Sequence, residues 1–352
     1  IKDGIFGKWL AGARDWSISR NRFWGAPIPV WRSDDPRYPR EDVYGSFAEL
    51  ERDFGVEITD LHRPFIDDVE IVRDGATYRR VPEVIDAWFD SGSMPFAQWG
   101  YPHVPGSAEK LEANYPADFI CEAIDQTRGW FYSLMAVGTL VFDESSYRNV
   151  VCLGHILAED GRKMSKHFGN ILEPIPLMDT HGADAVRWFM ACSGSPWMAR
   201  RVGDATIAKT VRKVLLTYWN TVAFQSLYAR ASGWEPGAAV PAVADRHVLD
   251  RWLVSATNEL IRDVTAALDD FDTQKAGALL AGFVDDLSNW YVRRSRRRFW
   301  AGEAGALATL HETLNVITQL MAPIMPFVTE RVWQDLFAAT DPAALELCGQ
   351  IL

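Results

Sequence analysis

The pattern of apolar positions divides the 352-residue chain into two parts of different texture. Up to about Cys192, short β-rich runs alternate with turns and a few helical stretches. From about Asp204 onward, apolar residues recur at the spacing of amphipathic helices. The helical stretches are marked by Ile207–Val222, Leu249–Val264, Ala276–Tyr291 (within a helix from Thr273 to about Trp300), Leu307–Met321 and Phe327–Leu336. Long amphipathic helices with short connections predict an antiparallel bundle.

The first part alternates strands with helices. The run Asp118–Cys121 is typical of a buried strand, Trp130–Val141 of a helix, and Arg148–Gly154 of the next strand. This order predicts a parallel, doubly wound sheet of the Rossmann type. Ligands bind such sheets beyond the carboxyl ends of the strands, which here are the turn Glu122–Gln126 and the loop that starts at Gly154.

A small insertion is predicted between residues 33 and 83, where charged, proline and turn residues are frequent. Ala26–Trp31 before it and Val69–Val72 within it are typical of strands or strand edges. We therefore expect an α/β part followed by an all-α part. Residues 1–32 and 84–203 would form the nucleotide-binding fold, 33–83 the insertion, and 204–352 the bundle.

Composition narrows the class further. The net charge is −11. The sequence contains no run of about 18 apolar residues, so no membrane span is predicted. No basic head and apolar stretch mark a signal peptide. The four cysteines, at positions 121, 152, 192 and 348, form no C-x-x-C pair, so we expect no zinc site and a reduced, cytoplasmic setting. We also expect a monomer.

The stretch "GRKMSKHFGN", Gly161–Asn170, places two lysines three residues apart. Lysine is a compact cation whose three donors suit phosphate oxygens, and Ser165 adds a hydroxyl. We therefore expect Lys163 and Lys166 to bind a polyphosphate on a loop that follows a strand. The alternative is an ordinary solvated basic loop.

A second basic feature is an arginine run in the third predicted helix. Its members are Arg293, Arg294, Arg296, Arg297 and Arg298. Arginine pairs with RNA phosphates and stacks on bases, so the run is a candidate RNA contact. The alternative is a solvated or salt-bridged helix end, in which Asp285 and Asp286 are possible partners.

Several stretches together resemble class I aminoacyl-tRNA synthetases, in the correct order and over nearly the whole chain. "GRKMSKHFGN" resembles the KMSKS loop, and "GADAVRWFM" resembles the segment that follows it. "DWSISRNRFWGAPIPVW" resembles the strand region where these enzymes resume after their editing insertion. "DAWFDSGSMPFAQWGYP", "EAIDQTRGWF" and "DDLSNWYVRRSRRRFW" resemble the isoleucine-specific branch of the class, and the valine-specific branch usually has a different segment in place of "DQTRGWF".

The chain departs from the family pattern in a few places. His167 stands where serine is typical, and "CLGH" at Cys152–His155 stands where many relatives have "CHG". His155 lies only eight residues before Lys163, so "CLGH" is not the upstream HIGH motif of the class, which these residues lack. The first residue is not methionine and "ELCGQIL" ends the chain, so we expect a fragment that is inactive alone.

The resemblance implies ATP-dependent activation of L-isoleucine and its transfer to tRNA(Ile), with Mg²⁺ accompanying ATP as substrate. It implies that Lys163 and Lys166 are catalytic. The ATP contacts would be Lys163, Ser165, Lys166 and Gly154, and the isoleucyl-adenylate contacts Glu122, Asp125, Gln126, Trp88 and Trp130. Contacts with tRNA would come from Arg293, Arg294, Arg296 and Arg297.

Two of these roles have simpler alternatives. Glu122 and Asp125 are also suited to capping the helix that follows, because acidic side chains favour helix N-termini. Trp130 is also suited to ordinary core packing, whereas Trp88 lies between Asp86 and Asp90 and is less suited to it.

Overall fold

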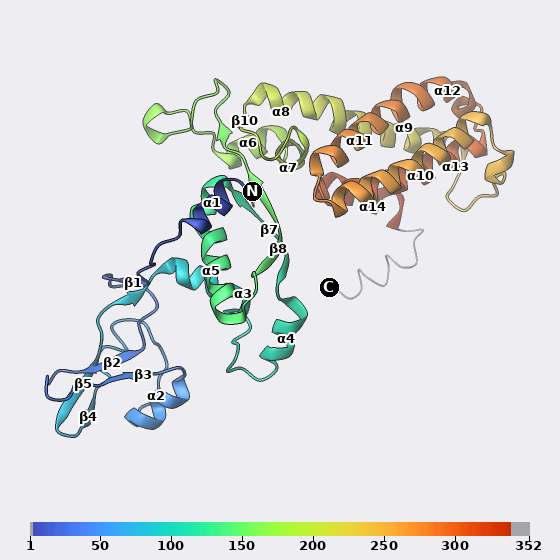
Figure 1. Ribbon diagram of the computed structural model, residues 1–352. Helices are drawn as coiled ribbons and strands as arrows, with labels where there is room; N and C mark the ends of the chain where they lie inside the picture. The colour runs from blue at the N-terminus through green and yellow to red at the C-terminus, as the bar shows by residue number, and fades with distance from the viewer. Residues whose placement is uncertain (1–2, 339–352) are drawn as a thin grey trace. The chain divides into compact units, whose positions relative to one another are not determined.

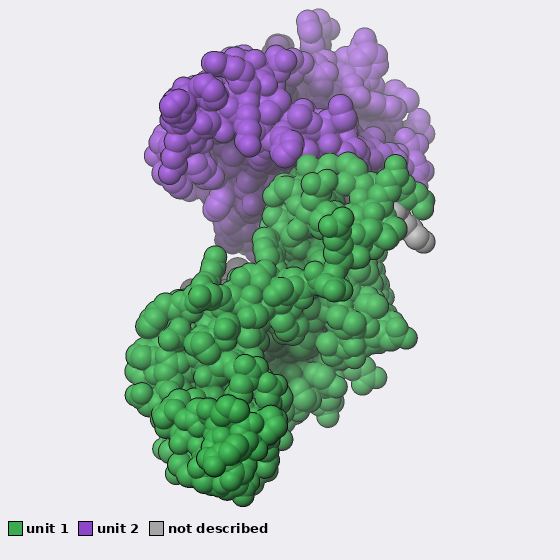
Figure 2. Space-filling model, turned by 60° about the vertical axis from the view of Figure 1, so that its left-hand side comes forward, with its two compact units in different colours: residues 1–153 green, residues 154–352 purple. Residues whose placement is uncertain are grey.

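The computed structural model describes residues 3–338, and these fall into two compact units, Ile1–Leu153 and Gly154–Leu352 (Figure 2). The stretch "ELCGQIL", at which we expected the chain to be truncated, lies outside the described residues. No helix among residues 3–338 is both long and apolar enough to cross a membrane.

The first unit contains a small antiparallel sheet in the region predicted as an insertion (Figure 1). Its strand order is β3 (Glu41–Val43), β2 (Val30–Ser33), β5 (Ala76–Arg80) and β4 (Ile71–Arg73), with helix α2 (Phe47–Phe54) beside it. Trp31, Tyr44 and Tyr78 are buried in a core of its own. The sheet begins at Val30, so the strand predicted at Ala26–Trp31 is confirmed only at its end.

The rest of the first unit surrounds two parallel strands. Its elements are α1 (Ile5–Ala11), the antiparallel pair β1 (Ser19–Arg20) and β6 (Val84–Ile85), α3 (Ala87–Ala97), α4 (Ser107–Asn114), β7 (Ala117–Ala123), η1 (Ile124–Arg128), α5 (Trp130–Phe142) and β8 (Tyr147–Leu153). The predicted strand, helix and strand are confirmed, and β7 and β8 are parallel as expected.

The burial predicted for Asp118–Cys121 is wrong. Within β7 only Ile120 is buried, and the Phe119 side chain is 42% exposed. Successive side chains of a strand point to opposite faces. Phe131 and Leu134 of α5 pack with Ile120, which lies on the opposite face of the strand from Phe119.

The second unit joins the lysine loop to the helix bundle. It begins with β9 (Ile156–Leu157), η2 (Lys166–Phe168), α6 (Pro174–His181), α7 (Ala183–Cys192) and β10 (Arg200–Arg201), which pairs with β9. Asp184 of α7 is buried and accepts hydrogen bonds from the Phe327 and Val328 backbone N–H groups, at 3.3 and 2.6 Å. This cap connects α7 to the last helix of the bundle.

The predicted helices of the bundle are all present among the described residues (Figure 1). They are α8 (Asp204–Thr210), η3 (Val211–Leu215) and α9 (Leu216–Ser232), α10 (Val248–Asp269), α11 (Thr273–Asp285), η5 (Asp286–Val292) and α12 (Arg293–Trp300), α13 (Ala304–Met321) and α14 (Pro326–Leu336), with a short turn η4 (Val243–Asp245) before α10. Most marker residues are buried in one core, although Trp252 and Phe327 are exposed. The segments η3 and η5 are π-helices, which periodicity did not predict.

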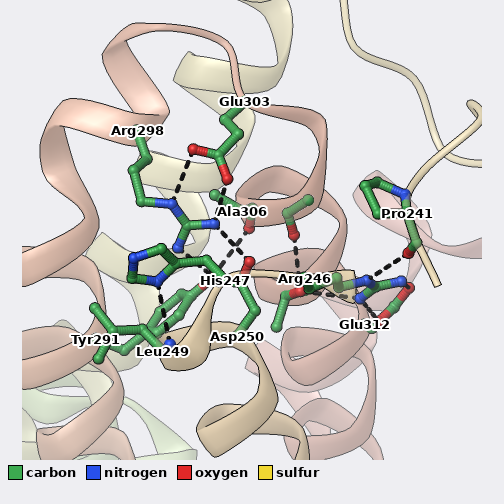
Figure 3. Close-up of polar contacts among 12 residues, drawn as sticks. Pro241, Arg246, His247, Leu249, Asp250, Tyr291, Arg298, Glu303, Ala306 and Glu312 are labelled. Carbon is green, nitrogen blue, oxygen red and sulfur yellow. Dashed lines mark hydrogen bonds and ion pairs between the residues drawn. The ribbon is translucent and has the colours of Figure 1, made fainter. Parts of the chain in front are cut away.

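A buried charge connects three helices of the bundle (Figure 3). The side chain of Asp250 in α10 has no exposed surface, and its carboxylate accepts a hydrogen bond from the Tyr291 hydroxyl at 2.8 Å. Both Nη groups of Arg298 also donate to this carboxylate, at 2.7 and 2.5 Å. Glu303 receives a further bond from Arg298 at 2.9 Å. Burial, and next the Asp250 carboxylate, raise the pKa of the Tyr291 hydroxyl, so this group donates at neutral pH.

We predict that Arg298→Met destabilises the bundle by about 3–5 kcal/mol, because it leaves the Asp250 carboxylate buried without its cation. Urea unfolding followed by helical circular dichroism measures the effect. The matched control is Arg262→Ala, which removes an exposed pair with Asp263 and costs at most about 1 kcal/mol. Equal effects of the two variants would contradict the prediction.

Candidate functional site

Lys163 lies in the second arm of a tight hairpin, just after the turn at Gly161. Leu157 and Lys163 form an antiparallel bridge, and the Gly161 N–H donates to the Ala158 carbonyl at 2.8 Å. Gly161 has φ of +83°, and a Cβ there would lie 2.9 Å from the Arg201 guanidinium carbon. The left-handed backbone therefore favours glycine at this turn, whereas the Arg201 side chain could move aside for a Cβ.

The rest of the lysine loop is fixed from within. The Ser165 N–H donates to Asn170 Oδ1 at 2.9 Å, and Asn170 Nδ2 donates to the Lys163 carbonyl at 3.2 Å. Met164 packs against the apolar cluster of α7 and α8. The backbone is thus anchored while the two lysine side chains are left in solvent.

Neither lysine ammonium group has a hydrogen bond or ion pair among residues 3–338. Ser165 Oγ accepts from the His167 N–H at 3.2 Å, so its O–H remains able to donate. His167 is exposed, and its ring lies at an edge-on angle to Phe168. A solvated basic loop and a phosphate-binding loop share this exposure, so the loop alone does not separate the two interpretations.

Gly154 is explained by packing. Its N–H donates to the Pro196 carbonyl at 2.8 Å, and a Cβ would lie 2.4 Å from the Met198 carbonyl oxygen. The Gly154 N–H therefore already has a hydrogen-bond partner within the second unit. His155 beside it is exposed, and its carbonyl accepts from the Arg200 N–H at 2.9 Å.

The acidic turn lies at the carboxyl edge of the parallel strands. Ala123 of β7 pairs with Leu153 of β8, so both strands end at the same edge. Glu122 and Asp125 are exposed there, and the Glu122 carboxylate has no partner among the described residues. Gln126 is half-buried and donates to Asp125 Oδ2 at 3.2 Å.

Neither acid makes a side-chain capping bond, although Asp125 lies in the first turn of η1. The N–H of Trp130, at the start of α5, is capped by Gln126 Oε1 at 2.9 Å. Among the described residues, no side-chain bond joins Glu122 or Asp125 to this helix end. Both carboxylates remain available to a ligand.

The two predicted tryptophans lie beside this turn. Trp88, at the start of α3, is 45% exposed, and its ring is close enough to Gly129 that an added Cβ would be 3.0 Å away. Trp130 is half-buried, and its Nε1 donates to the Ser91 carbonyl at 3.2 Å. Trp130 therefore contributes to packing between α3 and α5, as its alternative interpretation expected.

Two acids close to Trp88 were not assigned a role from the sequence. Asp86 is only 6% exposed and caps α3, with partners 66 and 70 residues earlier in the chain. Burial, and next the charge of Asp86, raise the pKa of Asp90. The helix-start position of Asp86 was visible in the sequence, but its distant partners were not.

The arginine run divides in two. Arg298 belongs to the buried ion pair with Asp250, whereas Arg293, Arg294, Arg296 and Arg297 are exposed. Within residues 3–338 none of these four forms an ion pair, and Asp285 instead accepts from Asn289 at 2.7 Å. The salt-bridged alternative therefore holds for Arg298 only.

The exposed arginines have two different settings. The Arg294 guanidinium carbon lies over the Trp290 ring, 3.7 Å from its centre, in a cation–π contact. Arg293 and Arg296 line a polar hollow of about 460 Å³ between α9 and the η5–α12 segment. Asn220, Ser288 and Asn289 also line it. Cations, amides and a hydroxyl together suit a polyanion with hydrogen-bonding groups.

Comparison with known families assigns the chain. Residues 1–200 match the family model "tRNA synthetases class I (I, L, M and V)". The chain belongs to the class I tRNA synthetases. Residues 250–348 of this synthetase chain also match the model "Anticodon-binding domain of tRNA ligase". The family resemblance predicted from the motifs is therefore confirmed.

The synthetase chain is similar to longer bacterial proteins. It is 67% identical to the isoleucine–tRNA ligase of Cutibacterium acnes over 97% of its length, and 65% identical to that of Streptomyces coelicolor over 98%. It spans 33% of the length of each of these curated relatives.

Solved structures support the fold alone. A LeuRS–tRNA–LeuAMS ternary complex from Agrobacterium radiobacter superposes with a TM-score of 0.67 at 18% identity, covering 91% of this synthetase chain and 40% of that one. A Mycobacterium tuberculosis methionyl-tRNA synthetase with methionyl-adenylate gives 0.66 at 17% identity, covering 93% and 55%.

No group of three or more His, Cys, Asp or Glu side chains within residues 3–338 is arranged to hold a metal ion. Cys121, Cys152 and Cys192 are free thiols, and Cys348 lies outside the described residues. The expectation that this synthetase chain binds no zinc stays a prediction.

We predict that Asn170→Ala loosens the lysine loop, because it removes the side chain that bridges Ser165 and Lys163. Limited trypsin digestion should then cut after Lys163 or Lys166 several-fold faster, with an unchanged melting temperature. Asn315→Ala, which removes a helix-surface contact with Gln319, is the matched control. Identical cleavage rates in the two variants would refute the bridging role.

Proposed function

We propose that this chain is part of an isoleucine–tRNA ligase, which activates L-isoleucine with ATP and transfers it to tRNA(Ile). The observation that carries the proposal is the identity of 65–67% to isoleucine–tRNA ligases over nearly the whole chain. The exposure of the motif lysines and acids, which leaves them free for substrates, supports it. A cytoplasmic location and a monomeric state are part of the proposal.

Lys163 and Lys166 stabilise the phosphates of ATP. In the first step a carboxylate oxygen of isoleucine attacks the α-phosphorus, and the bond to pyrophosphate breaks. Negative charge on the departing pyrophosphate grows during this step, and the two lysine ammonium groups lower the energy of the transition state. The Ser165 hydroxyl and the Gly154 segment complete the ATP contacts, and Mg²⁺ accompanies ATP as its counter-ion.

The catalysis requires no covalent enzyme intermediate, so position and charge account for it. The hairpin, Met164 and Asn170 fix the backbone of the lysine loop, which limits the conformational entropy that the loop loses on binding. Only the flexible lysine stems then need to be ordered.

The acidic turn and the tryptophans bind the amino acid and its adenylate. Asp125 is a counter-ion for the substrate ammonium group, while Glu122 and Gln126 contact the adenylate. Trp88 and Trp130 line the aliphatic side chain. Such a pocket rejects larger side chains by steric clash but discriminates weakly against one missing methylene group.

We place these residues in a Rossmann-type sheet of which β7 and β8 are two strands. The parallel pairing and the position of the turn at the carboxyl edge support this placement. Residues 1–32 and 84–203 then belong to the catalytic fold, 33–83 form an insertion, and 204–352 form the anticodon-binding bundle.

The four exposed arginines of the bundle contact tRNA. Arg293 and Arg296 face the polar hollow, and Arg294 and Arg297 extend the positive surface of α12. A chain with net charge −11 repels RNA on average, so an unpaired cationic face is needed to bind it. The match of residues 250–348 to an anticodon-binding model supports this role.

We predict that Lys166→Ala lowers isoleucine-dependent ATP–pyrophosphate exchange by about 10²–10³-fold in a full-length ligase that carries these residues, because it removes transition-state charge stabilisation. Lys275→Ala, at another exposed lysine, is the control and leaves exchange unchanged. The 352 residues alone, which contain no HIGH motif, should show no exchange. A Lys166→Ala enzyme with full exchange activity would contradict the catalytic role proposed for Lys166.

We predict that Arg296→Ala with Arg297→Ala weakens tRNA(Ile) binding and flattens its dependence on salt by about 0.7–0.9 per lost phosphate contact. Binding to the purified chain is measured by filter retention between low and moderate salt. Arg262→Ala with Arg331→Ala removes the same charge from exposed ion pairs elsewhere and is the matched control. An unchanged curve at low salt would contradict RNA contact by α12.

A further inference from the structure

Asp86 is a nearly buried acid that the proposed mechanism does not use. It lies directly before α3, two residues ahead of Trp88, and its side chain is 8% exposed. A carboxylate this far from solvent is costly unless both oxygens are satisfied. Its hydrogen bonds therefore show what the surrounding structure holds in place.

The two oxygens of Asp86 serve different segments. Oδ1 accepts the Trp88 N–H at 3.2 Å, which caps α3. Oδ2 accepts Trp16 Nε1 at 3.0 Å and Arg20 Nη2 at 2.6 Å. The Asp86 N–H also donates to the Ile18 carbonyl at 2.7 Å. One residue thus ties the Trp16–Arg20 segment to the start of α3.

The helix start that Asp86 holds carries the Trp88 ring. On its far side the ring meets Gly129, where a Cβ would lie 3.0 Å from a Trp88 carbon and 2.6 Å from Gln126 Oε1. Gln126 in turn caps α5 at Trp130. Trp88 is 45% exposed, so packing alone does not fix its ring. The bond to Asp86 holds the Trp88 backbone, and Gly129 restrains the ring itself.

A simple cap would need only one oxygen. Serine, threonine or asparagine would satisfy the Trp88 N–H equally well. Here the second oxygen receives an indole and a guanidinium, and the asparagine amide group would turn an N–H toward one of these donors. Asp90, one turn later, is no substitute, because its carboxylate has no partner among the described residues.

We propose that Asp86 is a positioning residue for the amino-acid pocket: it couples the Trp16–Arg20 segment to Trp88 and so sets the width of the cleft for the aliphatic side chain. This inference rests on the proposed function, in which Trp88 lines that cleft. Asp86 touches no substrate and acts through Trp88. A shift of about 1 Å in such a group is enough to lower turnover substantially.

The test uses a full-length ligase that carries these residues. ATP–pyrophosphate exchange gives kcat and KM for isoleucine, for valine and for ATP. Asp86→Ala should raise the isoleucine KM by about tenfold and lower the isoleucine-to-valine ratio of kcat/KM, with the ATP KM little changed. Arg20→Gln removes one arm of the same contact and should give a smaller change in the same direction, even where Asp86→Ala folds poorly.

A change on the other side of Trp88 checks the direction of the effect. In Gly129→Ala the new Cβ would lie 3.0 Å from the outer edge of the Trp88 ring and 2.6 Å from Gln126 Oε1, so this variant should lower the same ratio with Asp86 intact. In the double variant Asp86→Ala/Gly129→Ala the part of each effect that displaces the Trp88 ring should be non-additive. Asp67→Ala is the matched control, because this acid pairs with Arg63 and Arg80 in the insertion and should lower stability alone.

The outcomes separate the two levels of the proposal. If Trp88→Ala leaves the isoleucine KM unchanged, the assigned wall of the pocket is wrong, and the positioning role of Asp86 falls with it. If Trp88→Ala changes that KM while Asp86→Ala and Arg20→Gln lower only the melting temperature, as Asp67→Ala does, the wall stands and Asp86 is merely a stabilising cap.

Discussion

The buried Asp250 carboxylate fixes the orientation of the helix that carries the arginine run. A fully desolvated charge needs a partner for each oxygen, and Tyr291 and Arg298 supply them from η5 and α12. Because Arg298 must point toward α10, the other faces of α12 turn to solvent. Arg293, Arg296 and Arg297 occupy these faces, and Arg294 lies one turn earlier over Trp290.

The same arrangement recurs on a smaller scale in the other places where function is proposed. Asn170 joins two backbone points of the lysine loop, and Asp86 joins two chain segments at the start of α3. In each case a polar side chain forms its hydrogen bonds with other residues of the chain. The group beside it, a lysine or a tryptophan, is left exposed.

The sequence was informative where local pattern and physics agree. The 3.6-residue period located the bundle helices, since burial of one helix face is a property of consecutive residues. The strand–helix–strand order around Glu122–Gln126 was recovered for the same reason. The lysine loop and the acidic turn were recognised because their residues are contiguous.

What was missed depends on residues far apart in the chain. Asp250 meets Arg298 across 48 positions, and Asp86 meets Trp16 across 70, so no local period contains these pairs. Burial of β7 was overestimated because an apolar run does not say whether both faces of a sheet are covered.

The π-helical segment η5 constrains the length of the chain within the bundle. The helical phase between the buried Leu280 upstream and the buried Phe299 downstream depends on how many residues the π segment contains, so the number of residues there is under stricter constraint than their identity.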